Sequence, residues 1–123
     1  MIVYYTADNQ AGKRLERLFR QKLRHQRLQV FHRTGDVGDY LCRVGHIDMV
    51  FVLVVESMED LGAFLEMGSM LLDLKTIIVC PLQHGQLVDT ALRLYPRYLS
   101  STEGDLLDVL AVVEKLQSRF AAI

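Results

Sequence analysis

The hydrophobic pattern is clearest between residues 47 and 82. Residues 47–55 form an apolar run that is rich in β-branched side chains and lacks alternation, and residues 76–80 form a second such run. A strand that is apolar on both faces is typical of the interior of a parallel sheet with helices on both sides. Residues 57–73 between the runs are long enough for a helix. A right-handed crossover would place the two strands side by side or close to it, so the pattern predicts one β-α-β unit.

The remaining chain continues this alternation. Further strands are expected at 2–6, 28–32 and 97–100, and further helices at 10–25, at 36–44 with Gly45 closing it, at 87–94, and from Thr102 or Asp105 onward. The third and last helices are expected to bury Leu61, Phe64, Leu65, Leu71 and Leu72, and Leu106, Leu107, Leu110, Val113, Leu116 and Phe120. Five strands alternating with five helices predict one domain over residues 1–123, a three-layer α/β/α flavodoxin-like fold with a parallel sheet of order 2-1-3-4-5.

Composition narrows the class of protein. The chain has 123 residues, of which 50% are hydrophobic and 24% charged, an ordinary globular mixture. The longest apolar run, residues 49–55, is far too short to span a bilayer, so no membrane association is expected. The chain opens directly with a strand, which argues against a signal peptide. Cys42 and Cys80 are therefore expected to be reduced thiols in a cytoplasmic protein.

Charge is unevenly distributed along the chain. Residues 11–33 hold eight basic residues and one acid, a net charge of +7, and the rest of the chain carries −8. Four of the basic residues are spaced to share one exposed helix face: Lys13, Arg17, Arg20 and Arg24. This face predicts an acidic protein partner or a homodimer, with a solvated face on a monomer as the open alternative. The basic helix has no interleaved aromatic residue beyond Phe19, which argues against a nucleic-acid interface.

Polar residues at the expected strand ends are the candidates for a site. In an open α/β sheet ligands bind outside the carboxyl ends of the strands, near the reversal of strand order. The candidates at this edge are Asp8, Asn9, Glu56, Ser57 and His84. Asp8 and Glu56 would suit Mg²⁺, which prefers carboxylate oxygens, and no other metal or cofactor is expected. The open alternative is that Asp8 caps the first helix and Glu56 is solvated in a turn.

The chain resembles response-regulator receiver domains in the order and spacing of its elements, most specifically over residues 88–99 and 104–107. The resemblance implies a role in bacterial signal transduction. Receivers carry an acidic pair after strand 1, a phosphoacceptor Asp ending strand 3, a Thr or Ser ending strand 4 and a Lys after strand 5. This chain has one acid (Asp8), Glu56, Cys80 followed by Pro81, and Ser100 followed by Ser101. The expected function is therefore a non-catalytic, non-phosphorylated receiver-like module for signalling or protein contacts.

A second resemblance covers only the middle of the chain. Residues 62–68 and 74–79 are similar to the helix and strand of nucleoside deoxyribosyltransferases and related nucleotide-cleaving domains. That resemblance implies an enzyme that cleaves or transfers glycosyl groups, with Glu66 as the nucleophile and Glu56 nearby, because a carboxylate suits attack at an anomeric carbon. Such a nucleophile must line a pocket at the strand ends. The other interpretation of Glu66 is a residue of a solvated helix face.

Overall fold

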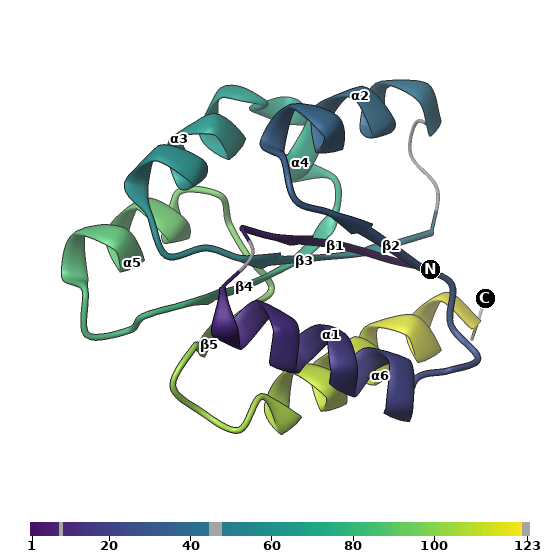
Figure 1. Cartoon of the computed structure of the whole chain (residues 1–123). Coiled ribbons are helices and arrows are strands. Elements are labelled where there is room, and N and C mark those ends of the chain that lie inside the picture. The colour runs from purple at the N-terminus through teal and green to yellow at the C-terminus, as the bar shows by residue number, and fades with distance from the viewer. Residues whose placement is uncertain (8, 45–47, 122–123) are drawn as a thin grey trace.

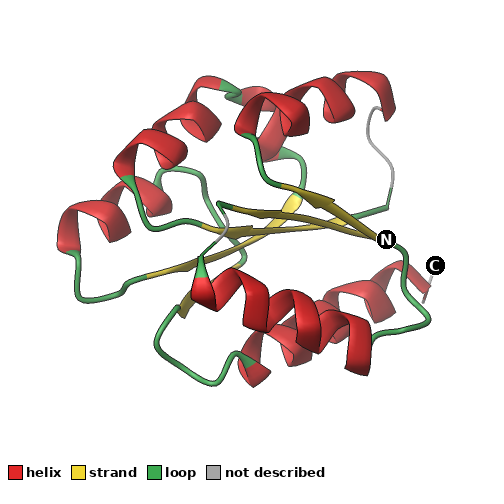
Figure 2. Cartoon of the chain, in the orientation of Figure 1, coloured by secondary structure: helices red, strands yellow, loops and turns green. Residues whose placement is uncertain are grey.

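The computed structural model describes residues 1–7, 9–44 and 48–121, with the backbone alone for residues 118–121. A five-stranded, all-parallel sheet of order β2-β1-β3-β4-β5 forms its centre (Figures 1 and 2). The strands are β1 (Ile2–Thr6), β2 (Leu28–Phe31), β3 (Val50–Val54), β4 (Lys75–Cys80) and β5 (Tyr98–Ser101). The predicted fold class and strand order are confirmed, including the adjacent pairing of β3 and β4.

Helices cover both faces of the sheet. They are α1 (Gln10–Lys22), α2 (Thr34–Val44), α3 (Met58–Glu66), α4 (Ser69–Leu72), α5 (Gly85–Leu92) and α6 (Leu107–Ala121). In Figure 1, α1 and α6 lie on one face and α2, α3, α4 and α5 on the other. We call these the α1/α6 layer and the α2–α5 layer.

Each strand supplies side chains to both layers, which explains the continuous apolar runs. Tyr4 and Val52 belong to the core under α1 and α6, whereas Tyr5 and Leu53 belong to the core under α2, α3 and α5. Neighbouring residues of a strand point to opposite faces, so a sheet with two buried faces needs apolar residues at every position. All residues of β1 and β3 are buried accordingly.

The helix predicted over residues 57–73 is interrupted. Gly68 has a φ of 52°, in the left-handed region that ends helices, and it separates α3 from the short α4. The chain turns there, so Leu72 is 55% exposed instead of buried as expected. The prediction of one helix was wrong. The hydrophobic pattern around Gly68 is compatible with one continuous helix as well as with a helix that ends at this glycine.

The last helix begins later than predicted. The helix α6 starts at Leu107, because Leu106 has a φ of 67° and the Asp105 carboxylate accepts a hydrogen bond from the Leu107 N–H at 3.0 Å. Leu106 is buried outside the helix, and Leu107 is 51% exposed rather than part of the core. Two further expectations, Gly45 as the end of the second helix and a buried Phe120, lie outside the residues and side chains that the structure describes.

Candidate functional site

The close packing of α1 on β1 fixes the geometry of the carboxyl edge. The Asn9 side chain caps α1 by accepting a hydrogen bond from the Gly12 N–H at 2.7 Å. Gly12 lies directly against Thr6, since a Cβ placed on Gly12 would clash with the Thr6 hydroxyl and stand 2.7 Å from the Thr6 Cβ. The helix therefore begins immediately above the end of β1, which brings Gln10 and Arg14 to the carboxyl edge of the sheet.

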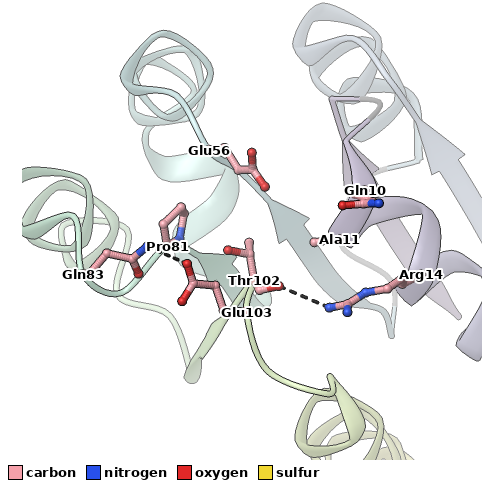
Figure 3. A pocket seen from close by; sticks show the side chains of 8 residues that line it. All are labelled: Gln10, Ala11, Arg14, Glu56, Pro81, Gln83, Thr102 and Glu103. Carbon is pink, nitrogen blue, oxygen red and sulfur yellow. Dashed lines mark hydrogen bonds between the residues drawn. The ribbon is translucent and has the colours of Figure 1, made fainter.

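A pocket of about 450 Å³ opens at this edge, where the strand order reverses between β1 and β3. We call it the strand-end pocket. Its walls come from α1 and from the segments that follow β3, β4 and β5 (Figure 3). The residues that line it are Gln10, Ala11, Arg14, Glu56, Pro81, Gln83, Thr102 and Glu103.

Two sets of hydrogen bonds connect the walls of the strand-end pocket. The Arg14 Nη2 atom donates to the carbonyl oxygens of Thr102 and Gly104, at 3.2 and 3.0 Å, and so joins α1 to the β5–α6 loop. The Gln83 amide donates to the Glu103 carboxylate at 2.8 Å and joins the β4–α5 loop to the same segment (Figure 3). One helix and two connections that are far apart in sequence are therefore held together by side chains of the pocket itself.

Among the described strand-end residues that were predicted from the sequence, Glu56 contributes a charged side chain to the pocket. It follows the buried Val55 in the connection from β3 to α3, and it is exposed. Figure 3 shows its carboxylate extending from that connection into the space in front of the sheet. With Glu103 it supplies two carboxylates, and Arg14 supplies one guanidinium. The pocket can therefore accept hydrogen-bond donors and cations, while its one guanidinium already binds two backbone carbonyls.

The other predicted strand-end residues have separate positions. Asn9 and Ser57 serve as helix caps, and the Ser57 hydroxyl accepts a hydrogen bond from the Asp60 N–H at 3.2 Å. His84 is exposed at the N-terminal end of α5, makes no side-chain cap and does not line the pocket. Asp8 lies outside the described residues. The structure thus places Glu56 in the pocket and uses Asn9 and Ser57 to begin helices.

The magnesium site expected from Asp8 and Glu56 stays a prediction. Within residues 1–7, 9–44 and 48–121, no cluster of three or more His, Cys, Asp or Glu residues is placed to hold a metal ion. Glu56 and Glu103 are the carboxylates that line the pocket, and Glu103 is hydrogen bonded to Gln83. A divalent ion would need further oxygen ligands, because Mg²⁺ takes six in near-octahedral geometry.

A half-buried polar cluster joins β5 to the first turn of α6. The Ser100 hydroxyl donates to Asp108 Oδ2 at 2.6 Å, and the Tyr98 hydroxyl donates to the same oxygen at 2.8 Å. Burial raises the pKa of Asp108, but the hydrogen bonds from Ser100, Tyr98 and the backbone outweigh it and hold this pKa below its ordinary value. The hydrogen bond to Asp108 also raises the pKa of Tyr98. The side chains therefore favour an ionised Asp108 at neutral pH.

Glu66 lies away from the strand-end pocket. It is the last residue of α3, a helix that begins next to Glu56 at the carboxyl edge and runs back along the sheet. Its side chain is exposed and is not among the residues that line the pocket. This position is that of a residue on a solvated helix face rather than of a nucleophile at the strand ends.

Three of the four predicted interaction residues lie on the outer face of α1. The prediction was wrong for Arg24, because α1 ends at Lys22 with Leu23 outside helical geometry, and Arg24 lies in the turn that follows. Lys13, Arg17, Arg20 and Arg24 are all exposed, and the buried residues Leu15 and Phe19 occupy the opposite side of the helix. Arg20 forms an ion pair with Glu16 at 3.1 Å. The outer face of α1 is therefore basic, and its one acid, Glu16, is paired with Arg20.

Sequence reasoning missed Arg14, Thr102 and Glu103 as residues of the pocket. Arg14 belongs to the basic block, and nothing in its neighbours distinguishes it from the exposed basic residues around it. Its partners are carbonyl oxygens 88 and 90 residues away, which carry no side-chain signal. Only the position of the β5–α6 loop beside α1 reveals the contact.

Comparisons with known proteins leave the family open. No protein-family model matches the chain, and no curated protein or solved structure shows significant similarity to it. In the described part of the chain, none of the helices has the length and apolar character needed to cross a bilayer.

Proposed function

We propose that this chain is a non-catalytic, receiver-like signalling module that acts through protein contacts and takes up no phosphoryl group. The observation that carries the proposal is the strand-end pocket, in which two of the three charged side chains that line it bind the protein's own loops. Arg14 binds the carbonyls of Thr102 and Gly104, and Glu103 binds Gln83. These contacts fix the loops in one arrangement, as suits a module that is recognised by its shape and charge.

The residues at the strand ends support the absence of phosphoryl chemistry. The resemblance to receivers implies a Lys after strand 5, and this chain has Ser100 and Ser101 there. Ser100 is buried and its hydroxyl is bound to Asp108, so it faces the core and not the pocket. At the end of strand 4, where receivers carry a hydroxyl, Cys80 is buried and burial raises the pKa of its thiol.

Glu56 supports a constitutive role for the pocket. The expected phosphoacceptor of receivers is an Asp at the end of strand 3, and Glu56 follows that strand here. The side chain of glutamate is longer than that of aspartate by one methylene group. Its carboxylate therefore supplies negative charge further from the strand end, without a phosphoryl group. An unmodified aspartate carries the same charge, so Glu56 changes the position of the permanent negative charge at the strand end and not its size.

Incubation with a small phosphodonor and Mg²⁺, followed by intact-mass measurement, tests the proposal. We expect no added phosphoryl group on the wild-type chain, on Glu56→Gln, or on Glu103→Gln as a second carboxylate variant of the same pocket. An added phosphoryl group on the wild type that is lost in Glu56→Gln and retained in Glu103→Gln would show that Glu56 or its neighbourhood accepts phosphate. That result would overturn the proposal.

The glycosyl-cleaving alternative has no support in the geometry. It required Glu66 to line a pocket at the strand ends, and Glu66 is exposed at the far end of α3. We therefore do not propose an enzymatic activity for this residue.

A cytoplasmic location fits the two thiols. Both cysteines are free: Cys42 is exposed in α2, and Cys80 is buried at the end of β4. Free thiols persist in reducing compartments, so we place the module in the cytoplasm. Mass measurement after alkylation in intact cells tests this point, and an oxidised Cys42 would contradict it.

A further inference from the structure

The two helical layers carry opposite charge. The helix α1 has five basic residues and one acid, and α6 has two of each. The helices of the α2–α5 layer together have six acids and one base. Because the two layers lie on opposite faces of one sheet, the molecule has a basic side and an acidic side (Figure 1). The chain's net charge of −1 conceals this separation.

The basic side has its charges in a row. Lys13 and Arg20 are seven residues apart on α1, with Arg17 between them, and all three are exposed. Seven residues are about two turns, so the row spans ~10.5 Å along the helix, given a rise of ~1.5 Å per residue. Like charges at this spacing repel one another, and an acidic surface opposite them would relieve the repulsion.

The acidic side has a row of the same length on α3. Glu59 and Glu66 are also seven residues apart, and both are exposed. Gly62 lies between them, and a Cβ placed on it would meet no atom within 4 Å, so this part of the helix surface is open. The absence of a side chain there leaves room for the long side chains of lysine or arginine to reach both carboxylates.

We infer that copies of this chain associate head to tail, with the basic face of α1 in one copy docked on the acidic face of α3 in the next. The inference rests on the proposed role of the chain as a protein-interaction module and names its partner as a second copy. The two faces are different surfaces of one molecule, so the contact is heterologous. Such a contact builds either an open chain, which has one free face at each end, or a closed ring. It does not build an isolated symmetric pair.

The association must depend strongly on salt. Its contacts are exposed ion pairs, and the Debye length falls from about 30 Å at 0.01 M salt to about 3 Å at 1 M. A docking surface of one helix against another is also small compared with a stable interface. The expected behaviour is therefore a reversible, concentration-dependent assembly that is lost at high salt.

Sedimentation of the wild type and of two neutralised variants tests the inference. Arg17→Gln with Arg20→Gln removes charge from the basic face, and Glu59→Gln with Glu66→Gln removes it from the acidic face. We expect the wild type to exceed its monomer mass of 14.1 kDa at low salt and to return to it at ~1 M salt. Each variant alone is expected to be a monomer. An equimolar mixture of the two is expected to form a pair and nothing larger, because each variant keeps one intact face.

Matched controls separate the faces from overall charge. Arg33→Gln with Arg97→Gln neutralises two exposed basic residues outside α1, and Asp48→Asn with Glu114→Gln neutralises two exposed acids outside the α2–α5 helices. Both control variants are expected to assemble like the wild type. Circular dichroism confirms that each variant is folded before its mass is measured.

Three results would overturn the inference: a monomeric wild type at low salt and high concentration, a neutralised variant that assembles like the wild type, or a mixture of the two variants that stays monomeric. None of these results changes the phosphodonor experiment, which tests the proposed function separately. A chain that fails to assemble but takes up no phosphoryl group would keep its proposed function and lose its proposed partner.

Discussion

The two helical layers are attached to strand β1 in similar ways but differ at their surfaces. Consecutive residues of β1 hold them: the Tyr4 hydroxyl donates to the Gly12 carbonyl oxygen of α1 at 2.7 Å, and the Tyr5 hydroxyl donates to Asp60 Oδ2 of α3 at 2.9 Å. Both rings are buried and each packs edge-on against a phenylalanine of its layer, Phe19 or Phe64. The interiors are thus equivalent, while the outer faces are basic on one side and acidic on the other.

This difference separates what stabilises the fold from what is available for recognition. The buried side chains supply the stability, because burial contributes roughly 25 cal/mol for each Å² of apolar surface. Exposed charges contribute roughly 0–1 kcal/mol for each pair. The opposite charges of the two layers are therefore not required by folding, and their separation fits a role in association.

Glycine substitutions should reveal the largest difference between the layers. Gly12→Ala forces a Cβ against Thr6 and disturbs the Asn9 cap, so we expect it to lower the free energy of unfolding by about 2–3 kcal/mol. Gly62→Ala adds a methyl group in open space on α3, and it should raise stability by about 0.5–1 kcal/mol through helix propensity. Urea unfolding measures both. Equal effects of the two substitutions would contradict the close approach of α1 to β1.

The two tyrosines should differ by a smaller amount. Tyr5→Phe removes a hydrogen bond to a half-buried carboxylate and should cost about 1–2 kcal/mol, whereas Tyr4→Phe removes one to a backbone carbonyl and should cost about 0.5–1.5 kcal/mol. Burial raises the pKa of both hydroxyl groups above the ordinary value, so neither is expected to ionise in the folded state near pH 10. Urea unfolding of the two variants measures these losses in the free energy of unfolding. A larger loss for Tyr4→Phe than for Tyr5→Phe would contradict the prediction.

Asp108 offers an effect smaller than those of Gly12→Ala and Tyr5→Phe, together with a pH signature. Its folded-state pKa lies below the ordinary value, so its stabilisation is present above about pH 3.9 and is lost as the pH falls through the folded pKa. Asp108→Asn weakens the charge-assisted hydrogen bonds from Tyr98 and Ser100 and should cost about 1 kcal/mol at pH 7, since the group is partly exposed.

Unfolding free energies of the wild type and Asp108→Asn between pH 2.5 and 7 check this prediction. The difference between them should be constant near neutral pH and shrink below about pH 4. A difference that grows as the pH falls would mean that the pKa of Asp108 is raised in the folded protein.

The sequence contained enough information for the sheet but not for every helix boundary. Apolar runs such as residues 47–55 identify buried parallel strands because both faces of each strand must be apolar. The break at Gly68 and the late start of α6 depend on single residues with positive φ, Gly68 and Leu106, and these leave no mark in the hydrophobic pattern. The exposure of Leu72 and Leu107 follows from those two local conformations.

The site could be predicted only in part for a related reason. Strand-end position alone identified Glu56 as a residue of this edge. The contacts of Arg14 depend on how the β5–α6 loop lies beside α1, which is a property of the packed fold. Asn9 and Ser57 are polar because they cap α1 and α3. They therefore resemble the residues of a binding site although they do not line the pocket.

Intermolecular paramagnetic relaxation is the most direct test of the head-to-tail pairing. Cys42 is exposed on α2, within the acidic layer, and Cys80 is buried, so a maleimide nitroxide should react at Cys42 alone. The spin-labelled chain is mixed with a ¹⁵N-labelled chain at low salt. We expect broadening of the amide signals of α1 around Arg17 and Arg20 in the ¹⁵N-labelled chain. This broadening should be lost at ~1 M salt, and also when the spin-labelled chain carries Glu59→Gln and Glu66→Gln. No broadening at low salt, or broadening confined to α2 and α3, would contradict the pairing.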